Sequence, residues 1–305
     1  MATIAVGGAS GMIGSALVDH LRGRGDTVIR LVRKAAVQPD ECGWDPAKEE
    51  LHLAGCKDVD VIVNLSGATL GRRWGPRYKR LLLNSRVRAT RTLARAAAAL
   101  GQHVTLVSAS AVGYYGDRGS EPLTEESGPG SDFLADLVQR WEAATEEASA
   151  AGNRVVFART GLALSPAGGA MKPMMPLLKL GLGGPLGPGT QYWPWISLND
   201  EVRALTWLID KQISGPVNLT SPATSTHAEI VRAVARGLGR PAVLGVPTWA
   251  LRLVLGEATD MVVASQNQRP EVLVDSGFVF EQPTLPELVE WFVSQRNGAR
   301  PARIV

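Results

Sequence analysis

Residues 3–14 read TIAVGGASGMIG and contain glycines three positions apart at Gly8, Gly11 and Gly14. A β-branched run enters these glycines, and an amphipathic helix is expected from about residue 13 to residue 23. Glycine lets the backbone turn tightly and approach a pyrophosphate, and a helix N-terminus presents unpaired N–H groups to an anion. A plain strand-to-helix turn is the alternative, but a position after a strand and before a helix favours a dinucleotide site. The residues expected to form this site are Gly8, Ser10, Gly11, Met12, Ile13 and Gly14.

The rest of the chain alternates between strand and helix patterns. Apolar runs predict further strands at 27–32, 59–65, 104–108 and 154–159, and helical patterns occupy 77–100 and 132–150. This alternation predicts an α/β fold with a Rossmann-like doubly wound parallel sheet. Residues 1–161 should form a nucleotide-binding domain, joined by a strand that returns near 216–221. Residues 162–305 should form mainly a smaller substrate lobe and C-terminal domain, in which the Gly-, Pro- and Met-rich stretch 167–190 suits a loop or lid.

The composition argues against several classes of protein. The 32 Lys and Arg residues nearly balance 29 Asp and Glu, and the Arg-rich stretch 86–95 suits a solvated helix face, so nucleic acid is not an expected partner. No apolar run approaches the roughly 18 residues of a membrane span, and a strand pattern starting at Thr3 leaves no room for a signal peptide. The two cysteines have no metal-ligand spacing. We therefore expect a cytoplasmic protein that binds neither membrane nor metal.

The end of the second strand indicates which dinucleotide is bound. An NAD site usually has an acidic residue there, which accepts a hydrogen bond from the ribose 2′-hydroxyl, whereas an arginine suits the 2′-phosphate of NADP. This chain has Arg33 followed by Lys34. The pair therefore predicts NADP as the cofactor, with a solvated pair of strand-end cations as the alternative.

Several further segments resemble one superfamily. The glycine pattern, NLSGA at 64–68 and SASAVGYYGD at 108–117 together resemble extended short-chain dehydrogenases/reductases. More narrowly, RTG at 159–161, GLGGP at 181–185 and VPTWALR at 246–252 are similar to the NAD(P)-dependent "epimerase family protein" group, which has a small C-terminal domain. The resemblance covers nearly the whole chain. It implies that Leu65, Ser66, Gly67, Ser108, Thr160 and Gly161 also line the cofactor groove, although the apolar members would equally suit the core.

The catalytic residues of that superfamily are only partly present. Typical members carry Ser, Tyr and Lys, the last two spaced Tyr-x-x-x-Lys on one helix face so that the ammonium lowers the pKa of the Tyr. Ser110 matches the Ser, but Phe133 stands where a Tyr is expected and no lysine occurs between residues 81 and 171. Tyr114 is the leading substitute acid, with a structural tyrosine as the alternative. Tyr115, Asp117 and Glu125 also follow the strand that carries Ser110.

A small basic and aromatic cluster suggests the substrate side. Arg72, Arg73 and Trp74 follow the third strand, and Arg86 stands where the superfamily more often has Asn. Together they are candidates for holding an anionic or carboxylated substrate, with a solvated loop as the alternative. Tyr192 from the lobe is a further substrate candidate and a weaker substitute acid than Tyr114. Met171, Met174 and Met175 suit either a pocket wall or, preferably, ordinary core.

These observations predict an NADP-dependent oxidoreductase or epimerase-like enzyme that acts on a small polar substrate, either a carbonyl compound or a sugar derivative. The missing Tyr–Lys pair keeps a second hypothesis open, in which the chain is a non-catalytic NADP-binding sensor or regulatory protein. A homodimer paired through exposed helices is compatible with the sequence but not required by it.

Overall fold

The computed structural model describes residues 1–33, 35–51, 56, 58–101, 103–166 and 168–296. Its centre is an eight-stranded sheet with the order β12-β8-β6-β5-β1-β2-β3-β4, in which every neighbouring pair is parallel except β3–β4. The strands are β1 (Thr3–Gly7), β2 (Thr27–Val32), β3 (Glu41–Asp45), β4 (Glu50–Leu51), β5 (Val61–Asn64), β6 (Thr105–Ala111), β8 (Arg154–Thr160) and β12 (Gly215–Leu219). The predicted fold class is therefore confirmed.

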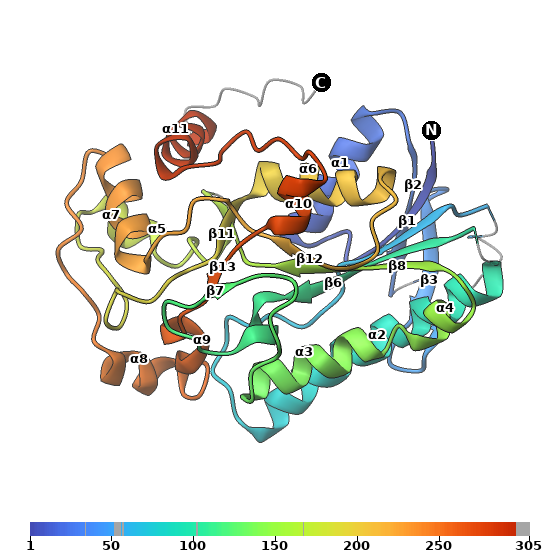
Figure 1. Ribbon diagram of the computed structural model, residues 1–305, viewed down its shortest axis with the longest axis horizontal. Coiled ribbons are helices and arrows are strands. Elements are labelled where there is room, and N and C mark those ends of the chain that lie inside the picture. The colour runs from blue at the N-terminus through green and yellow to red at the C-terminus, as the bar shows by residue number, and fades with distance from the viewer. Residues whose placement is uncertain (34, 52–55, 57, 102, 167, 297–305) are drawn as a thin grey trace.

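Helices cover both faces of this sheet (Figure 1). On one face lie α1 (Met12–Gly23), α6 (Leu198–Asp210) and α10 (Glu271–Asp275), packed through Leu17, Leu205 and Leu273. On the other face lie α2 (Pro76–Leu100), α3 (Phe133–Ala143) and α4 (Glu146–Ala150), with Ala89 and Leu93 of α2 against Ile62 and Leu106 of the sheet. The nearly continuous apolar runs of the central strands are explained by burial on both faces.

A second lobe lies beyond the carboxyl ends of the central strands (Figure 1). Its small sheet has the order β10-β9-β11 and packs with helices on a core that contains Met171, Met174 and Met175, so these methionines fill the core. The lobe comprises β9 (Leu162–Ser165), β10 (Gly168–Gly169), β11 (Trp195–Ser197), α5 (Met175–Lys179), α7 (His227–Gly237), α8 (Thr248–Leu255), α9 (Thr259–Val263) and α11 (Leu285–Arg296).

The chain after α9 returns to the main sheet. Strand β13 (Asn267–Gln268) pairs with β7 (Pro122–Leu123), and α10 packs on β12. Strand β12 itself joins β8 in parallel, so both 215–219 and 267–275 belong to the body built mainly by residues 1–161.

Some predicted elements differ from the structure. The helix expected over 132–150 is divided into α3 and α4, because the chain leaves the helix at Ala144 and Thr145 and the Thr145 hydroxyl donates to the Glu142 carbonyl. Strands β3 and β4 were not predicted, and the stretch 167–190 holds the short helix α5 rather than loop alone. Among the described residues no helix has the length and apolar content that a bilayer crossing requires.

Candidate functional site

The turn between β1 and α1 can be formed only by glycine at two positions. Gly8 has a φ of +79°, and a Cβ there would lie 2.6 Å from the Leu65 carbonyl oxygen. A Cβ at Gly14 would overlap the carbonyl oxygen of Gly8. The first turn of α1 therefore packs directly on β1 and on the loop after β5, which brings Leu65, Ser66 and the glycine turn together.

The N-terminus of α1 is open to a ligand. Ser10 and Gly11 are exposed, Gly11 makes no side-chain capping hydrogen bond, and the first turn of α1 contains no acidic residue. Unpaired N–H groups and the positive end of the helix dipole favour an anion here. Gly168 and Gly169 of the lobe lie against the Met12 side chain, so the lobe reaches this turn.

Arg33 lies at the next strand end along the sheet. It is exposed and lines an open cavity of about 550 Å³, together with Glu41, Trp44 and Lys48 among others. We call this the Arg33 cavity. Lys34, predicted to assist Arg33, lies outside the described residues.

A second cavity, of about 180 Å³, lies on the other side of the glycine turn between the sheet edge and the lobe. We call it the cleft. Its walls include the end of β8 at Thr160 and Gly161, the start of α3, α2 and the α8–α9 region. Aromatic and charged side chains line it, namely Trp74, Phe133, Trp141, Trp193, Lys79, Arg86, Asp132, Glu257 and Asp260.

Two predicted substrate residues, Trp74 and Arg86, lie on this cleft. Trp74 is buried, donates its indole N–H to the Leu70 carbonyl at 3.0 Å and packs edge-on against Phe133. Arg86 is 8% exposed, and burial lowers the pKa of its guanidinium to about 10. The remaining three, Arg72, Arg73 and Tyr192, lie off the cleft. Arg72 and Arg73 are exposed, with Arg73 donating to the Leu253 carbonyl, and Tyr192 is held through its backbone by Ser265 and Gln266.

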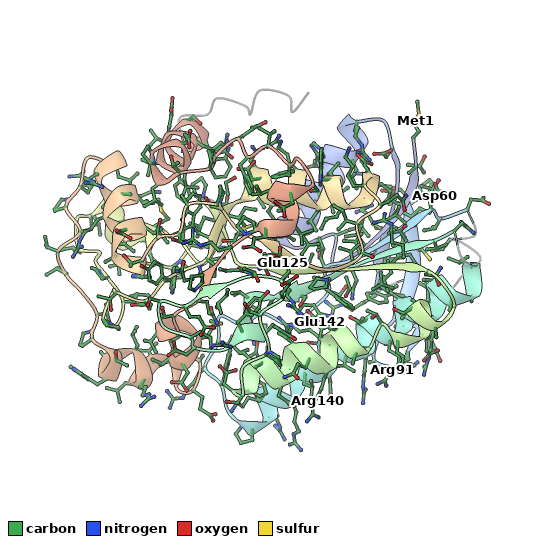
Figure 2. The ribbon with its side chains drawn as sticks, viewed as in Figure 1. Met1, Asp60, Arg91, Glu125, Arg140 and Glu142 are labelled. Carbon is green, nitrogen blue, oxygen red and sulfur yellow. The ribbon has the colours of Figure 1, made fainter. Side chains whose placement is uncertain are left out.

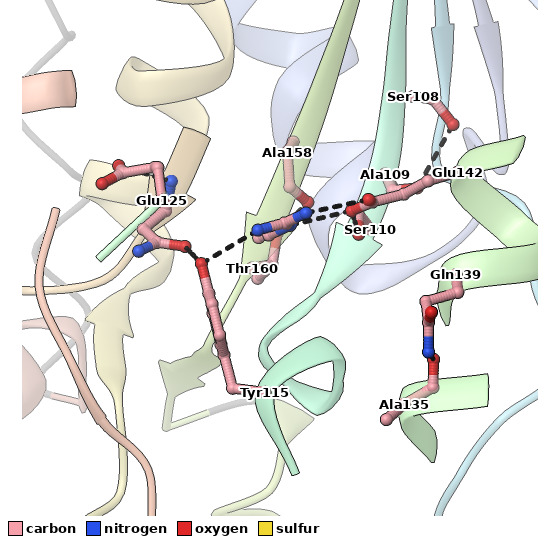
Figure 3. A network of polar contacts seen from close by, with 12 residues as sticks. Ser108, Ala109, Ser110, Tyr115, Glu125, Ala135, Gln139, Glu142, Ala158 and Thr160 are labelled. Atoms are coloured by element: carbon pink, nitrogen blue, oxygen red, sulfur yellow. Dashed lines mark hydrogen bonds and ion pairs between the residues drawn. The ribbon is translucent and has the colours of Figure 1, made fainter. Parts of the chain in front are cut away.

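Ser110 and Tyr115 belong to a buried polar network (Figure 3). The Ser110 hydroxyl donates to Glu142 Oε1 at 2.6 Å, and Arg159 donates to both oxygens of Glu142 at 2.8 and 2.9 Å. Arg159 also donates to the Tyr115 hydroxyl, and its guanidinium lies 3.5 Å from the Tyr114 ring centroid. The lining of the cleft includes neither Ser110 nor Tyr114.

The network continues to the edge of the sheet. The Tyr115 hydroxyl donates to Asn218 Oδ1 at 2.7 Å, and the Asn218 N–H donates to Glu125 at 2.9 Å. Burial raises the pKa values of Tyr115 and Glu125. A fully hydrogen-bonded tyrosine that is 0% exposed holds strands together and is not placed to act on a ligand. Ser108, 1% exposed with its hydroxyl on the Ala109 carbonyl, is likewise part of the sheet.

A pair that the sequence did not reveal lies behind the end of β8. The Thr160 hydroxyl donates to Glu201 Oε1 at 2.8 Å, and Glu201 is 0% exposed with Oε2 lacking a described partner. Burial raises the pKa of Glu201 to about 8, so this carboxyl is largely protonated at neutral pH. Glu201 is acidic and follows another acidic residue, Asp200, so the sequence gives no sign that it is buried. Its burial results from the packing of α6 on the sheet.

A contact between segments far apart in the sequence was also not predicted. Lys79 of α2 forms an ion pair with Glu257, 178 residues later, and both side chains line the cleft. Lys79 also lies 4.6 Å from the Phe133 ring centroid. The described residues include no group of three or more His, Cys, Asp or Glu side chains suited to a metal ion.

The chain is similar to a known protein family over most of its length. Residues 4–219 match the model of the NAD dependent epimerase/dehydratase family, and residues 246–292 match a domain of unknown function, DUF1731. An epimerase family protein of Mycobacterium bovis is 45% identical over 289 residues, covering 94% of this chain and 96% of the relative. One from Staphylococcus haemolyticus is 35% identical over 287 residues, covering 91% and 94%.

Two solved structures are also similar. The human epimerase family protein SDR39U1 (isoform 2), crystallised with NADPH, has a TM-score of 0.86 at 30% identity and covers 96% of this chain and 99% of its own. A nucleoside-diphosphate sugar epimerase from Corynebacterium glutamicum has a TM-score of 0.79 at 35% identity, covering 96% of this chain and 58% of its own. The resemblance stated from the sequence is thereby confirmed.

Proposed function

The chain belongs to the NAD dependent epimerase/dehydratase family, and from this premise we propose that it is an NADPH-dependent oxidoreductase acting on a small polar substrate in the cleft. One observation carries the proposal. The sheet order β8-β6-β5-β1-β2 places Thr160, the loop at 65–67, the glycine turn and Arg33 in series along the carboxyl edge of the sheet. In open α/β sheets, ligands bind at this edge.

The residues along this edge fit a dinucleotide phosphate. The exposed N-terminus of α1 would bind the pyrophosphate, because Gly11 leaves room for close approach and no acidic side chain repels it. Arg33, which lines the Arg33 cavity, would bind the 2′-phosphate. Gly67, Thr160 and Gly161 would flank the nicotinamide end, which when bound supplies or accepts a hydride.

Thr160 is the residue that the cleft offers for proton transfer. Its hydroxyl donates to the largely protonated Glu201 in the structure. For proton transfer it would turn to donate to a developing alkoxide, and the carboxyl would in turn donate its proton to Thr160 Oγ1. Tyr114, the acid predicted from the sequence, instead stacks on Arg159. We therefore assign proton transfer to Thr160 and Glu201, and stacking on Arg159 to Tyr114.

The cofactor is tested by titrating purified protein with NADPH and with NADH, measured by calorimetry. We expect NADPH to bind at least tenfold more tightly, and Arg33→Ala to remove most of this preference, because a charge-assisted phosphate contact contributes about 1.5–3 kcal/mol. Arg80→Ala, an exposed arginine of α2 away from both cavities, should leave both affinities unchanged. Equal affinity of the wild type for the two dinucleotides would refute the assignment of Arg33.

The reaction is tested by NADPH oxidation with a panel of small aldehydes and 2-oxo acids. Thr160→Val should abolish turnover while NADPH still binds, and Tyr114→Phe should retain it. A second function, an NADP-binding sensor without turnover, is favoured by the fact that the lining of the cleft contains no tyrosine and its one lysine is paired with Glu257. NADPH binding without turnover on any member of the panel would support the sensor.

A further inference from the structure

Arg86 is a buried cation that forms no ion pair with any of the described residues. Its Nη1 donates to the Leu82 carbonyl at 3.2 Å, and the described residues provide no carboxylate for it. Buried arginines are normally paired, because an uncompensated charge in a low-dielectric interior is costly. An unpaired guanidinium on the wall of a cavity can bind an anion that enters the cavity.

The other charged groups around the cleft are already engaged. Glu257 pairs with Lys79, Asp260 pairs with Arg252, and Asp132 accepts the Ala135 N–H at the start of α3. These carboxylates are exposed at the rim, where solvent and salt screen them. Arg86 is the deeply buried charge of the lining, so its positive field acts on an occupant without such screening.

The surroundings of the guanidinium fix its orientation. Its Cζ lies 5.1 Å from the Trp141 ring centroid. On another side, a Cβ placed on Gly67 would lie 3.1 Å from the same Cζ, so the guanidinium packs on bare backbone in the loop after β5. A fixed planar fork with free N–H groups matches a carboxylate or phosphate in bidentate geometry.

We infer that the cleft binds a small organic anion, such as a carboxylate, through the Arg86 guanidinium. This inference rests on the proposed function, since it names the class of substrate that would face the cofactor. The same chemistry would be supplied by a phosphate of the dinucleotide, because Gly67 lies in the loop beside the glycine turn. The experiment separates the two sources.

The test compares benzoate with benzamide, which have nearly the same shape and differ in charge. Full-length protein saturated with NADPH is titrated with each compound by calorimetry. We expect benzoate to bind about tenfold or more tightly than benzamide. Arg86→Gln should remove this preference and leave NADPH affinity unchanged, whereas Arg88→Gln, exposed two positions along the same helix and bonded to the Ala47 carbonyl, should behave as the wild type.

Each other outcome has a definite meaning. Loss of NADPH affinity in Arg86→Gln but not in Arg88→Gln assigns the guanidinium to the dinucleotide and overturns the substrate assignment. Equal affinities of the wild type for benzoate and benzamide, or no binding of either to the NADPH complex, overturn the inference while the proposed cofactor function stands. If the wild type binds no NADPH, the proposed function itself fails.

A loss of benzoate binding in Arg86→Gln can be distinguished from misfolding by thermal melts. Without cofactor, Arg86→Gln should be at least as thermostable as the wild type. Removing an unpaired buried charge relieves its desolvation cost. A lower melting temperature in the variant would mean that Arg86 is structural and would also count against the inference.

Discussion

Glu201 shows how one buried side chain links stability to pH. Its folded-state pKa is raised from 4.5 to about 8, because burial disfavours the charged form. Between these values the unfolded chain releases a proton that the folded chain keeps, so folding stability falls as pH rises from about 5 to about 8 and then levels off. At about 1.4 kcal/mol per pKa unit, the loss amounts to a few kcal/mol.

Glu201→Gln should remove this loss. The variant keeps the length of the side chain and can hydrogen-bond to Thr160, so it should match the wild type near pH 5 and exceed its melting temperature by several degrees at pH 8. Thermal melts across that pH range, with the exposed Glu126→Gln as the control, measure the effect. A constant difference between variant and wild type at every pH would contradict burial of a neutral carboxyl.

The Glu142–Arg159 pair illustrates the opposite case, a buried charge with its partner. Both oxygens of Glu142 accept from Arg159, and Arg159 is 4% exposed. Glu142→Ala should cost about 3–5 kcal/mol, because it leaves the guanidinium buried and unpaired. On the same helix Asp136 pairs with Arg140, whose place at the surface is labelled in Figure 2, and Asp136→Ala should cost less than about 0.5 kcal/mol. Urea unfolding of both variants provides the comparison, and similar losses would disprove the distinction.

At the scale of elements, helix α1 depends on one glycine and not on another. Gly14→Ala should cost several kcal/mol and abolish NADPH binding, because the added methyl overlaps the Gly8 carbonyl and displaces α1 from the turn. Gly23, in the last turn of the same helix, has open space around its Cα, so Gly23→Ala should be neutral or stabilising by up to about 1 kcal/mol. Circular dichroism melts and NADPH titration measure both effects. Retained NADPH affinity in Gly14→Ala would show that the turn tolerates a side chain.

The elements also show what could be predicted from the sequence. The parallel sheet could be predicted from local patterns, since each central strand carries its own apolar run. The turn after the first strand could be predicted from the spacing of Gly8, Gly11 and Gly14 alone. Trp74 and Arg86 both follow the same strand in sequence and both line the cleft, whereas their role toward a substrate stays a prediction. The Lys79–Glu257 contact and the burial of Glu201 depend on packing between segments far apart in the sequence, which no local pattern records. Ser110 and Tyr114 matched a motif, but the structure directs them to Glu142 and Arg159.

At the scale of the whole molecule, the main domain and the C-terminal segment should unfold together. Leu273 of α10 is 0% exposed in the same core as α1, α6 and the central strands. Leu273→Ala should therefore lower the stability of the whole chain by about 2–5 kcal/mol, whereas Val274→Ala, half exposed on the same helix, should have little effect. Coincident transitions in tryptophan fluorescence and circular dichroism would confirm a single unit. Two separate transitions, with only the later part of the chain affected, would refute it.

The two edges of the eight-stranded sheet have a consequence for synthesis and self-association. One edge is the two-residue antiparallel β4, and at the other the Asn218 N–H of β12 is bound by Glu125 while its side chain is bonded to Arg269. In the folded molecule these two described edges therefore offer little free backbone for pairing strand to strand. During translation, Glu125 is made before β12, but α10, which packs on β12, emerges only after that strand. Until α10 is made, β12 lacks the apolar cover that Leu273 provides, and this interval exposes the nascent chain to aggregation.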